Sequence, residues 1–309
     1  MNIKTIQAWV SAFRLRTLPL SLSVVATGSA LAAQEGRLSV PTLGLCLTTT
    51  LFLQILSNLS NDYGDTVHGA DGSDRLGPMR AVQSGAISLS QMRRAMVVFT
   101  LLSLASGVAL LVEASGTIGN ATTFEFLVLG ILCIAASITY TNGRHPYGYH
   151  GLGDASVFLF FGLVGVGGCY FLHTGHLAWP VALPATAVGL LSVSVLNMNN
   201  IRDMESDRAA GKKTVPLRIG RRGAKAYQAV VVVTAVALLS AYIALFGTRA
   251  QWICTLAAVP LLSNAIGSLR HDDAAYFDSQ LRLVSLSTFA FSLLFFGACA
   301  AAQKVDINI

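Results

Sequence analysis

Two pairs of aspartates follow long apolar stretches of this chain. The first pair is Asp62 and Asp65, and the second pair is Asp203 and Asp207. Residues three or four positions apart lie on one face of a helix, so each pair presents its carboxylates together. If the pairs met, two carboxylates roughly 4 Å apart would repel by about 4 kcal/mol at an effective dielectric of about 20. A divalent cation would remove this repulsion, and we predict that all four aspartates are metal ligands.

Magnesium suits this arrangement best, because Mg²⁺ prefers oxygen ligands, binds to one or two carboxylates and takes further oxygens from substrate phosphates. The two pairs therefore predict a diphosphate substrate. A single acidic loop would more simply balance neighbouring lysines and arginines, but two matched pairs favour the metal.

Amide side chains lie beside both aspartate pairs, and basic side chains follow the second pair; together they extend the predicted site. The amides could bind metal or phosphate oxygen, and the basic residues could close over an anionic leaving group. An asparagine at a helix end is also a common cap, and basic loops also follow from membrane topology. We predict substrate contacts for Asn61, Asn199, Asn200, Arg208 and Lys213, and a catalytic role for Lys212.

The elements that carry these residues read as membrane helices. Of 309 residues, 53% are hydrophobic and 12% are charged, whereas about 25% are charged in an average globular protein. Nine apolar stretches are each close to the ~20 residues that cross a bilayer. We predict an all-α, polytopic membrane protein with one domain over residues 1–309 and spans at 17–33, 40–58, 95–113, 124–141, 154–172, 180–200, 228–246, 252–268 and 283–301.

Basic residues are concentrated on one side of this topology. The N-terminus and loops 59–94, 142–153, 201–227 and 269–282 hold 18 of the 21 lysines and arginines, leaving Arg37, Arg249 and Lys304 on the other side. Short basic loops remain in the cytoplasm. We therefore expect a cytoplasmic N-terminus, acidic motifs in the cytoplasmic loops 59–94 and 201–227, and location in the inner (plasma) membrane. The net charge of +6 follows from this topology and requires no nucleic-acid partner.

Several other features have simpler interpretations. The first apolar stretch resembles a cleavable signal peptide, but we favour a retained helix. The five cysteines fall in apolar stretches and are predicted to be small buried hydrophobes. His173 and His176 lie on the outer side, where we expect an ordinary loop. Gly162, Gly165, Gly167 and Gly168 are predicted to permit close helix packing.

Five separated sequence blocks resemble the UbiA superfamily of intramembrane prenyltransferases, and within it the branch that acts on 1,4-dihydroxy-2-naphthoate. The likeness extends from residue 14 to about residue 220, and we expect the last three helices to be hydrophobic packing. The superfamily's first motif is usually NDxxDxxxD, whereas residue 69 is glycine here and the next acid is Asp71, a fifth candidate ligand. The blocks are Arg16-Thr17-Leu18-Pro19, Asn61-Asp62-Tyr63-Gly64-Asp65, residues 77–85, residues 147–154 and Asn199-Asn200-Ile201-Arg202-Asp203.

The resemblance implies a nine-helix bundle and a magnesium-dependent reaction. A polyprenyl diphosphate would lose pyrophosphate, its allylic carbon would join the naphthoate ring, and carbon dioxide would leave to give demethylmenaquinone. Lysine and arginine would stabilise the departing diphosphate, and aromatic faces would stabilise the allylic cation. The residues implied for these tasks are Arg80, Arg202, Lys212, Tyr140, Tyr147, Tyr149, Phe158 and Phe161.

The loop at 142–153 is predicted to form part of the acceptor pocket. His150 could accept a hydroxyl proton or bind the naphthoate carboxylate, because its unperturbed pKa is about 6.5. His145 and Asp154 lie on the same side of the membrane. A simple hydrogen-bonding role in the loop is the alternative for His150.

Two other functions remain open from the sequence. A prenyltransferase for 4-hydroxybenzoate or homogentisate would keep the metal motifs and change the aromatic pocket, although residues 147–154 favour naphthoate. A secondary transporter would use the carboxylates to couple cations, but its acids should lie near the midplane of the membrane. Here they lie at the ends of the predicted helices.

Overall fold

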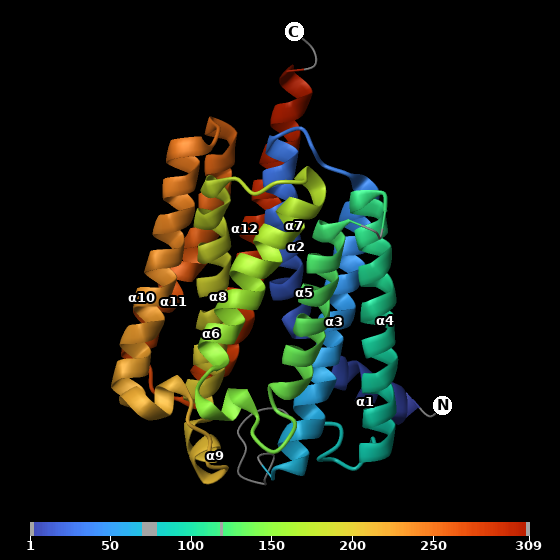
Figure 1. Ribbon diagram of the computed structural model, residues 1–309. Coiled ribbons are helices and arrows are strands. Elements are labelled where there is room, and N and C mark those ends of the chain that lie inside the picture. The colour runs from blue at the N-terminus through green and yellow to red at the C-terminus, as the bar shows by residue number, and fades with distance from the viewer. Residues whose placement is uncertain (1–2, 70–78, 118–119, 307–309) are drawn as a thin grey trace.

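The computed structural model describes residues 3–69, 79–117 and 120–306, and within these ranges the chain forms helices and no strands. The predicted all-α class is confirmed. The main helices are α1 (Ile3–Phe13), α2 (Leu18–Gln34), α3 (Val40–Val67), α4 (Leu89–Ser115), α5 (Ala121–Thr139), α6 (Gly153–Val157), α7 (Gly165–Thr174), α8 (Ala182–Arg202), α9 (Met204–Ala209), α10 (Val215–Phe246), α11 (Ala258–Arg270) and α12 (Ala274–Asp306). The long helices stand side by side in one bundle, and the short helices α1 and α9 lie at one end of it (Figure 1).

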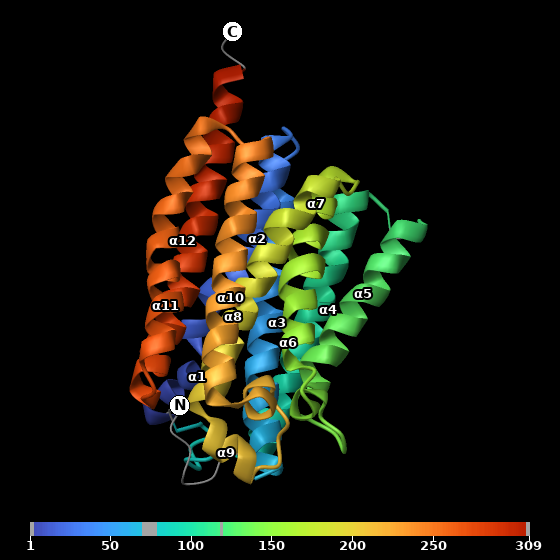
Figure 2. The same cartoon turned by 90° about the vertical axis from the view of Figure 1, so that its left-hand side faces the viewer.

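Nine helical segments of the described residues are long and apolar enough to cross a membrane, and each coincides with a predicted span. The chain is therefore a multi-pass membrane protein. Figure 2 shows α9, the end of α3 and the loop after α5 at one end of the bundle, and the end of α12 at the opposite end. The predicted placement of these loops on a common side agrees with this arrangement.

The two central helices are α2 and α8. In each, 67% of the residues in the apolar window are buried, a larger share than in the other spans. Helix α2 packs against α12, α7 and α3, and α8 packs against α10 and α12. Removing the first apolar stretch as a signal peptide would therefore remove the centre of the bundle, so the structure favours the retained helix.

Small residues let these helices approach closely, as expected for membrane bundles. A Cβ atom on Gly28 of α2 would lie 2.7 Å from Cβ of Cys169 on α7. A Cβ on Gly162 would lie 2.7 Å from the carbonyl oxygen of Ala185 on α8. The prediction of close packing is confirmed for Gly162 and for Gly165, where a Cβ would lie 2.5 Å from Cγ1 of Val24 on α2. A Cβ on Gly167 or Gly168 would meet no atom closer than 3.8 Å.

The fifth span is not a continuous α-helix. Its first turn is α6, a π-helical segment η3 (Phe158–Val164) follows, and α7 completes the span. A π-helical turn changes which side chains share a face, and such turns are frequent at functional sites. Phe160 and Phe161 of η3 both border the main cavity described below.

The acidic motifs are helical rather than parts of loops. Asp62 and Asp65 lie in the last turns of α3, and Asp203 and Asp207 lie at the junction of α8 and α9. The predicted spans ended early because hydropathy detects only the apolar part of a helix. For the same reason α10 begins at Val215 instead of residue 228, with a break at Gly220, whose φ is 74°.

Candidate active site

A cavity of about 1050 Å³ lies inside the acidic end of the bundle. Residues from both aspartate pairs line it, although more than 130 positions separate the pairs in the sequence. The predicted site residues that line it are Asn61, Asp62, Asp65, Arg80, Tyr140, Tyr147, Tyr149, Asn199, Asn200, Asp203, Asp207 and Lys212. The tertiary structure therefore assembles most of the predicted site.

The first aspartate pair is positioned by contacts between the ends of α3 and α5. The hydroxyl of Thr141 donates to the carbonyl oxygen of Ser60 at 3.0 Å, and the amide of Asn142 donates to the Ser60 hydroxyl at 2.6 Å. Gly64 permits this contact, because a Cβ there would lie 2.5 Å from the carbonyl oxygen of Thr141. The buried carboxylates of Asp62 and Asp65 thus lie on a fixed helix end.

Asp65 is held by three different groups. Arg80 forms an ion pair with its Oδ2 at 2.6 Å, and the hydroxyl of Tyr149 donates to its Oδ1 at 2.6 Å. The ammonium of Lys212 lies 3.4 Å from the same Oδ1. Arg80 also donates to the backbone oxygen of Asn61 at 2.6 Å, which connects the loop after α3 to the motif.

Lys212 joins the two aspartate pairs. Its Nζ lies 3.4 Å from Asp65 and 2.9 Å from Asp207, and 4.8 Å from the ring centroid of Tyr149. Burial lowers the pKa of the Lys212 ammonium, but the carboxylates of Asp65 and Asp207 raise it above its usual value. Lys212 therefore stays charged, and one cation reaches both motifs.

The pKa of Asp207 shows the opposing effects at this site. Burial raises it, the nearby Lys212 ammonium lowers it, and the net result is above the usual value. Asp203 and Asp65 contribute repulsion that also raises it. This is the repulsion between carboxylates that the sequence predicts when the two pairs meet.

Arg202 lies behind the cavity rather than on its wall. Its side chain is 1% exposed and donates to both carboxylate oxygens of Asp203, at 2.8 and 2.6 Å. It also contacts Asp278 at 2.5 Å and Asn199 at 2.8 Å. This geometry suits a positioning residue that orients Asp203, instead of the predicted direct catalytic contact.

Aromatic residues form another wall of the cavity. The rings of Tyr140 and Tyr147 meet edge to face at 5.3 Å, and the Tyr147 hydroxyl donates to the backbone oxygen of Ala136. Burial raises the pKa of both phenols, so they stay neutral. Phe161 lines the cavity as predicted, whereas Phe158 packs against Gly189 of α8.

Other predicted residues lie away from the cavity wall. The side chain of His150 is exposed, and its backbone oxygen accepts a bond from Arg218 at 2.6 Å. The side chain of Lys213 is exposed, and its backbone N–H donates to the backbone oxygen of Tyr149 at 2.8 Å. Arg208 pairs with Glu205 on the surface of α9. The structure thus does not support substrate contacts for these side chains, and Asp71 lies outside the described residues.

Asp154 also points away from the main cavity. Its carboxylate accepts a hydrogen bond from the hydroxyl of Tyr227 on α10 at 3.0 Å, and it is not among the residues of the cavity wall. The residues of its loop that do reach the wall are Tyr147, Gly148 and Tyr149. The predicted acceptor loop therefore contributes tyrosines rather than His150 and Asp154.

The expectation that the last three helices are only hydrophobic packing is wrong for α12. Asp278 and Arg282 of this helix line the cavity, and Arg16 of the N-terminal segment lies 3.9 Å from Asp278. Arg14 also lines it. One feature of the sequence indicates this contribution of α12 to the cavity: the predicted topology places the charged loop 269–282 on the same side as the aspartate motifs.

The donor set of the cavity fits a hard divalent cation. Asp62, Asp65, Asp203 and Asp207 supply buried carboxylates from two helix ends, and Asn61 and Asn200 supply amide groups beside them. Mg²⁺ binds to oxygen donors of this kind. Cysteines and histidines, which prefer softer ions, are not among the residues that we assign to this donor set.

Comparison with known proteins identifies the family. The model of the UbiA prenyltransferase family matches residues 21–286, most of the chain. This protein belongs to the UbiA prenyltransferase family. Among its UbiA relatives, 1,4-dihydroxy-2-naphthoate octaprenyltransferase of Escherichia coli (strain K12) is 41% identical over 95% of each chain. The enzyme of the same name from Haemophilus influenzae is 42% identical over 84% of each chain.

Solved structures of UbiA homologues have the same fold. The apo structure of the homologue from Aeropyrum pernix K1 matches with a TM-score of 0.64 at 22% identity, over 95% of this chain and 99% of that one. The homologue from Archaeoglobus fulgidus bound to GPP and Mg²⁺ matches with a TM-score of 0.63 at 14% identity, with the same coverage. The predicted UbiA-type bundle is confirmed.

Proposed function

We propose that this UbiA enzyme transfers a polyprenyl group from polyprenyl diphosphate to 1,4-dihydroxy-2-naphthoate, with Mg²⁺ as its cofactor. The observation that carries the proposal is the contact of Lys212 with both Asp65 and Asp207 inside one large cavity. Carboxylates at two helix ends could hold the metal ion, and the Lys212 ammonium between them could bind the diphosphate. The relatives named above support the naphthoate as acceptor.

Each part of the diphosphate has a partner in the cavity. Asp62, Asp65, Asp203 and Asp207 would hold Mg²⁺, which when bound neutralises charge that develops on the leaving diphosphate. Lys212 and Arg80 add positive charge beside the same carboxylates. Preorganised cations in a water-poor site stabilise a developing anion more strongly than water does.

The prenyl carbon becomes cationic as its bond to oxygen breaks. Neutral tyrosine rings suit this stage, because an aromatic face attracts a cation and a protonated phenol is a poor nucleophile. Tyr140 and Tyr147 line the cavity, and their raised pKa values keep them protonated. These residues would protect the allylic cation until the aromatic ring of the acceptor attacks it.

The acceptor is an anion and needs positive charge elsewhere in the cavity. Arg14, Arg16 and Arg282 line it and supply that charge. After carbon–carbon bond formation the acceptor carboxylate leaves as carbon dioxide, and the product is demethylmenaquinone in its hydroquinone form. No role for His150 in this step is supported by its exposed position.

The location of the site supports entry of the water-soluble naphthoate, and of the diphosphate head group, from one side of the membrane. All four aspartates lie at helix ends, on the side that carries 18 of the 21 basic residues. Short loops rich in lysine and arginine stay cytoplasmic. The proposal therefore places the site at the cytoplasmic face of the inner membrane.

The test is product formation by purified protein in detergent with a long-chain prenyl diphosphate. Parallel reactions contain 1,4-dihydroxy-2-naphthoate or 4-hydroxybenzoate, with Mg²⁺ or with EDTA. We expect Mg²⁺-dependent prenylation of the naphthoate alone. Transfer to 4-hydroxybenzoate instead would retain the mechanism and overturn the acceptor, and transfer to neither by folded protein would reopen the transporter alternative.

A further inference from the structure

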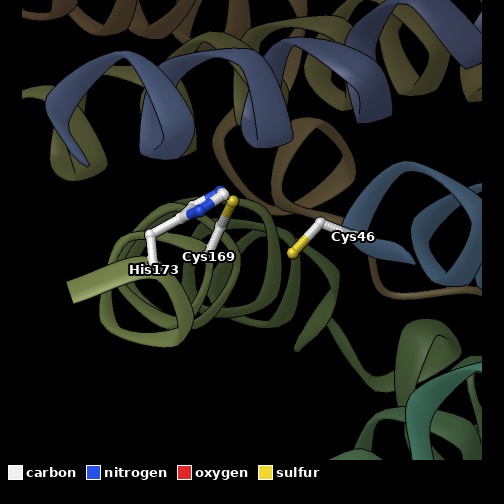
Figure 3. Close-up of side chains that lie close together, drawn as sticks. All are labelled: Cys46, Cys169 and His173. Atoms are coloured by element: carbon white, nitrogen blue, oxygen red, sulfur yellow. The ribbon is translucent and has the colours of Figure 1, made fainter. Parts of the chain in front are cut away.

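A second group of reactive side chains lies in the half of the bundle remote from the aspartates. Cys46 is in the second turn of α3, and Cys169 and His173 are one turn apart on α7 (Figure 3). One sulfur or nitrogen atom from each residue lies within 4.8 Å of the others. Both thiols are buried, and neither forms a disulfide. The proposed transfer reaction uses none of these groups.

We propose that Cys46 and Cys169 are a redox-active dithiol, which a membrane-soluble quinone oxidises to a disulfide that joins α3 to α7. Both S–H bonds break and one S–S bond forms. The two electrons and two protons pass to the quinone, which becomes a hydroquinone. The inference concerns sites and chemistry separate from prenyl transfer and does not rest on the proposed function.

Hydrogen bonds connect the Cys169 thiol to His173, Ser29 and Val25. The backbone N–H of Ser39 donates to Nδ1 of His173 at 3.3 Å, which assigns the proton of the neutral ring to Nε2. Nε2 lies 3.0 Å from Oγ of Ser29, and that hydroxyl lies 3.4 Å from Sγ of Cys169. With this ring proton, Nε2 donates to Ser29, the Ser29 hydroxyl can donate to the sulfur, and the Cys169 thiol donates its own proton to the carbonyl oxygen of Val25 at 3.6 Å. Donors such as the Ser29 hydroxyl stabilise a thiolate, the reactive form of cysteine.

The same hydrogen bonds disfavour a metal ion at this cluster. A histidine ligand normally donates its second ring N–H to an acceptor, whereas Nδ1 of His173 accepts from Ser39. Binding through Nε2 would then require loss of the ring proton. A dithiol has no such requirement, because Nε2 of His173 can keep its proton and donate to Ser29.

An apolar cavity gives a hydrophobic oxidant access to both thiols. This cavity has a volume of about 160 Å³ and lies between α3, α4, α5 and α7. Cys46 and Cys169 both line it, together with Leu110, Leu111 and Phe126. Its walls suit a quinone dissolved in the bilayer better than glutathione, which is charged. The apolar lining of this cavity therefore favours a hydrophobic oxidant that is dissolved in the membrane.

Disulfide formation requires the two sulfur atoms to move together. The sulfurs must approach from at most 4.8 Å to the bond length of about 2.05 Å. Cys169 packs tightly against α2, because a Cβ added to Gly28 of α2 would lie only 2.7 Å from the Cβ of Cys169. We therefore expect rotation of the Cys46 side chain to close the gap, as its sulfur points toward α7 in Figure 3.

The test counts free thiols in the purified full chain before and after incubation with duroquinone. This quinone is fully substituted, so it oxidises thiols without the usual conjugate addition. Denaturation with excess N-ethylmaleimide followed by intact mass should give five adducts before oxidation and three afterwards, from the five cysteines. Peptide mapping should show a Cys46–Cys169 link, and one equivalent of hydroquinone should form.

Cys46→Ala and Cys169→Ala should each keep four adducts after oxidation, whereas the matched control Cys133→Ala should fall from four to two. Five adducts in oxidised wild-type protein, or loss of two thiols in folded Cys46→Ala, would overturn the proposal. Protection of Cys46 and Cys169 from labelling by Zn²⁺ in folded protein, with no oxidation by quinone, would also overturn it and identify a metal site.

Discussion

Single residues in the main cavity differ sharply in what their side chains touch. Lys212 contacts carboxylates of both motifs, whereas its neighbour Lys213 is exposed and contributes a backbone N–H. Asp203 and Glu205 differ in the same way, because Asp203 is buried and Glu205 is exposed beside Arg208. Substitution of each residue of such a pair in turn therefore distinguishes a direct role in the site from a general effect of the charge.

Lys212→Met should lower kcat by about 100- to 1,000-fold, the usual loss when one preorganised donor is removed from a developing anion. Lys213→Met makes the same change in net charge and should leave kcat within about threefold of wild type. Steady-state product formation with saturating Mg²⁺ measures both. Equal losses in the two variants would contradict the assignment of Lys212.

Asp62→Ala and Asp203→Ala should each lower turnover by at least about 100-fold while the protein still inserts in the membrane. The reason is that loss of an outer partner of a metal ligand already costs about 10- to 100-fold. Glu205→Ala is the control and should retain activity, since its side chain is 75% exposed. Normal product formation by folded Asp62→Ala would remove the basis for the metal site.

At the scale of elements, the helix ends decide the geometry of the site. The end of α3 docks on the end of α5 through Ser60, Gly64 and Thr141. Arg202 of α8 joins Asp203 to Asp278 of α12. The aspartate pairs face one another because these contacts fix the ends of four helices, α3, α5, α8 and α12, at one end of the bundle.

Gly64→Ala should destabilise the protein by about 1–3 kcal/mol, the range for an overpacked contact. Its Cβ would lie 2.5 Å from backbone of Thr141, which cannot move as a flexible side chain can. Gly44→Ala in the same helix has no atom within 4 Å and should be neutral or stabilising by about 0.5–1 kcal/mol. Thermal unfolding in detergent compares the two, and an equal midpoint for both variants would refute this contact.

At the scale of the whole molecule, the bundle separates two chemical environments. The aspartate end holds a polar, charged cavity, while the opposite half holds the dithiol and a smaller apolar cavity. Asp62 lies about 24 Å along α3 from Cys46, at 1.5 Å per residue. Oxidation of the thiols is therefore measurable without disturbance of the aspartates.

The proposed orientation predicts which ends of the bundle face each compartment. Arg208→Cys places an exposed thiol at the aspartate end, and Arg249→Cys places one at the opposite end. In right-side-out vesicles a membrane-impermeant maleimide should label Arg249→Cys and spare Arg208→Cys. Inside-out vesicles should give the reverse pattern, with wild-type protein reporting the native thiols. Labelling of Arg208→Cys from outside would invert the topology.

Local sequence patterns are sufficient to predict the class of fold and the carboxylates of the site. Nine apolar stretches predict nine spans because a bilayer of fixed thickness requires a fixed helix length. The spacing of Asp62 and Asp65, and of Asp203 and Asp207, predicts one face each because helical periodicity is local. These properties depend only on residues near one another in the chain.

The contacts between distant side chains come from the packing of the helices in the tertiary structure. It turned His150 outward, placed Arg202 behind Asp203, and brought Asp278 of the last helix to the cavity. It also placed Cys46 beside Cys169, although 122 residues lie between them. Such contacts follow from the rotation and register of packed helices, which depend on close approaches such as that at Gly28 and which local sequence patterns do not contain.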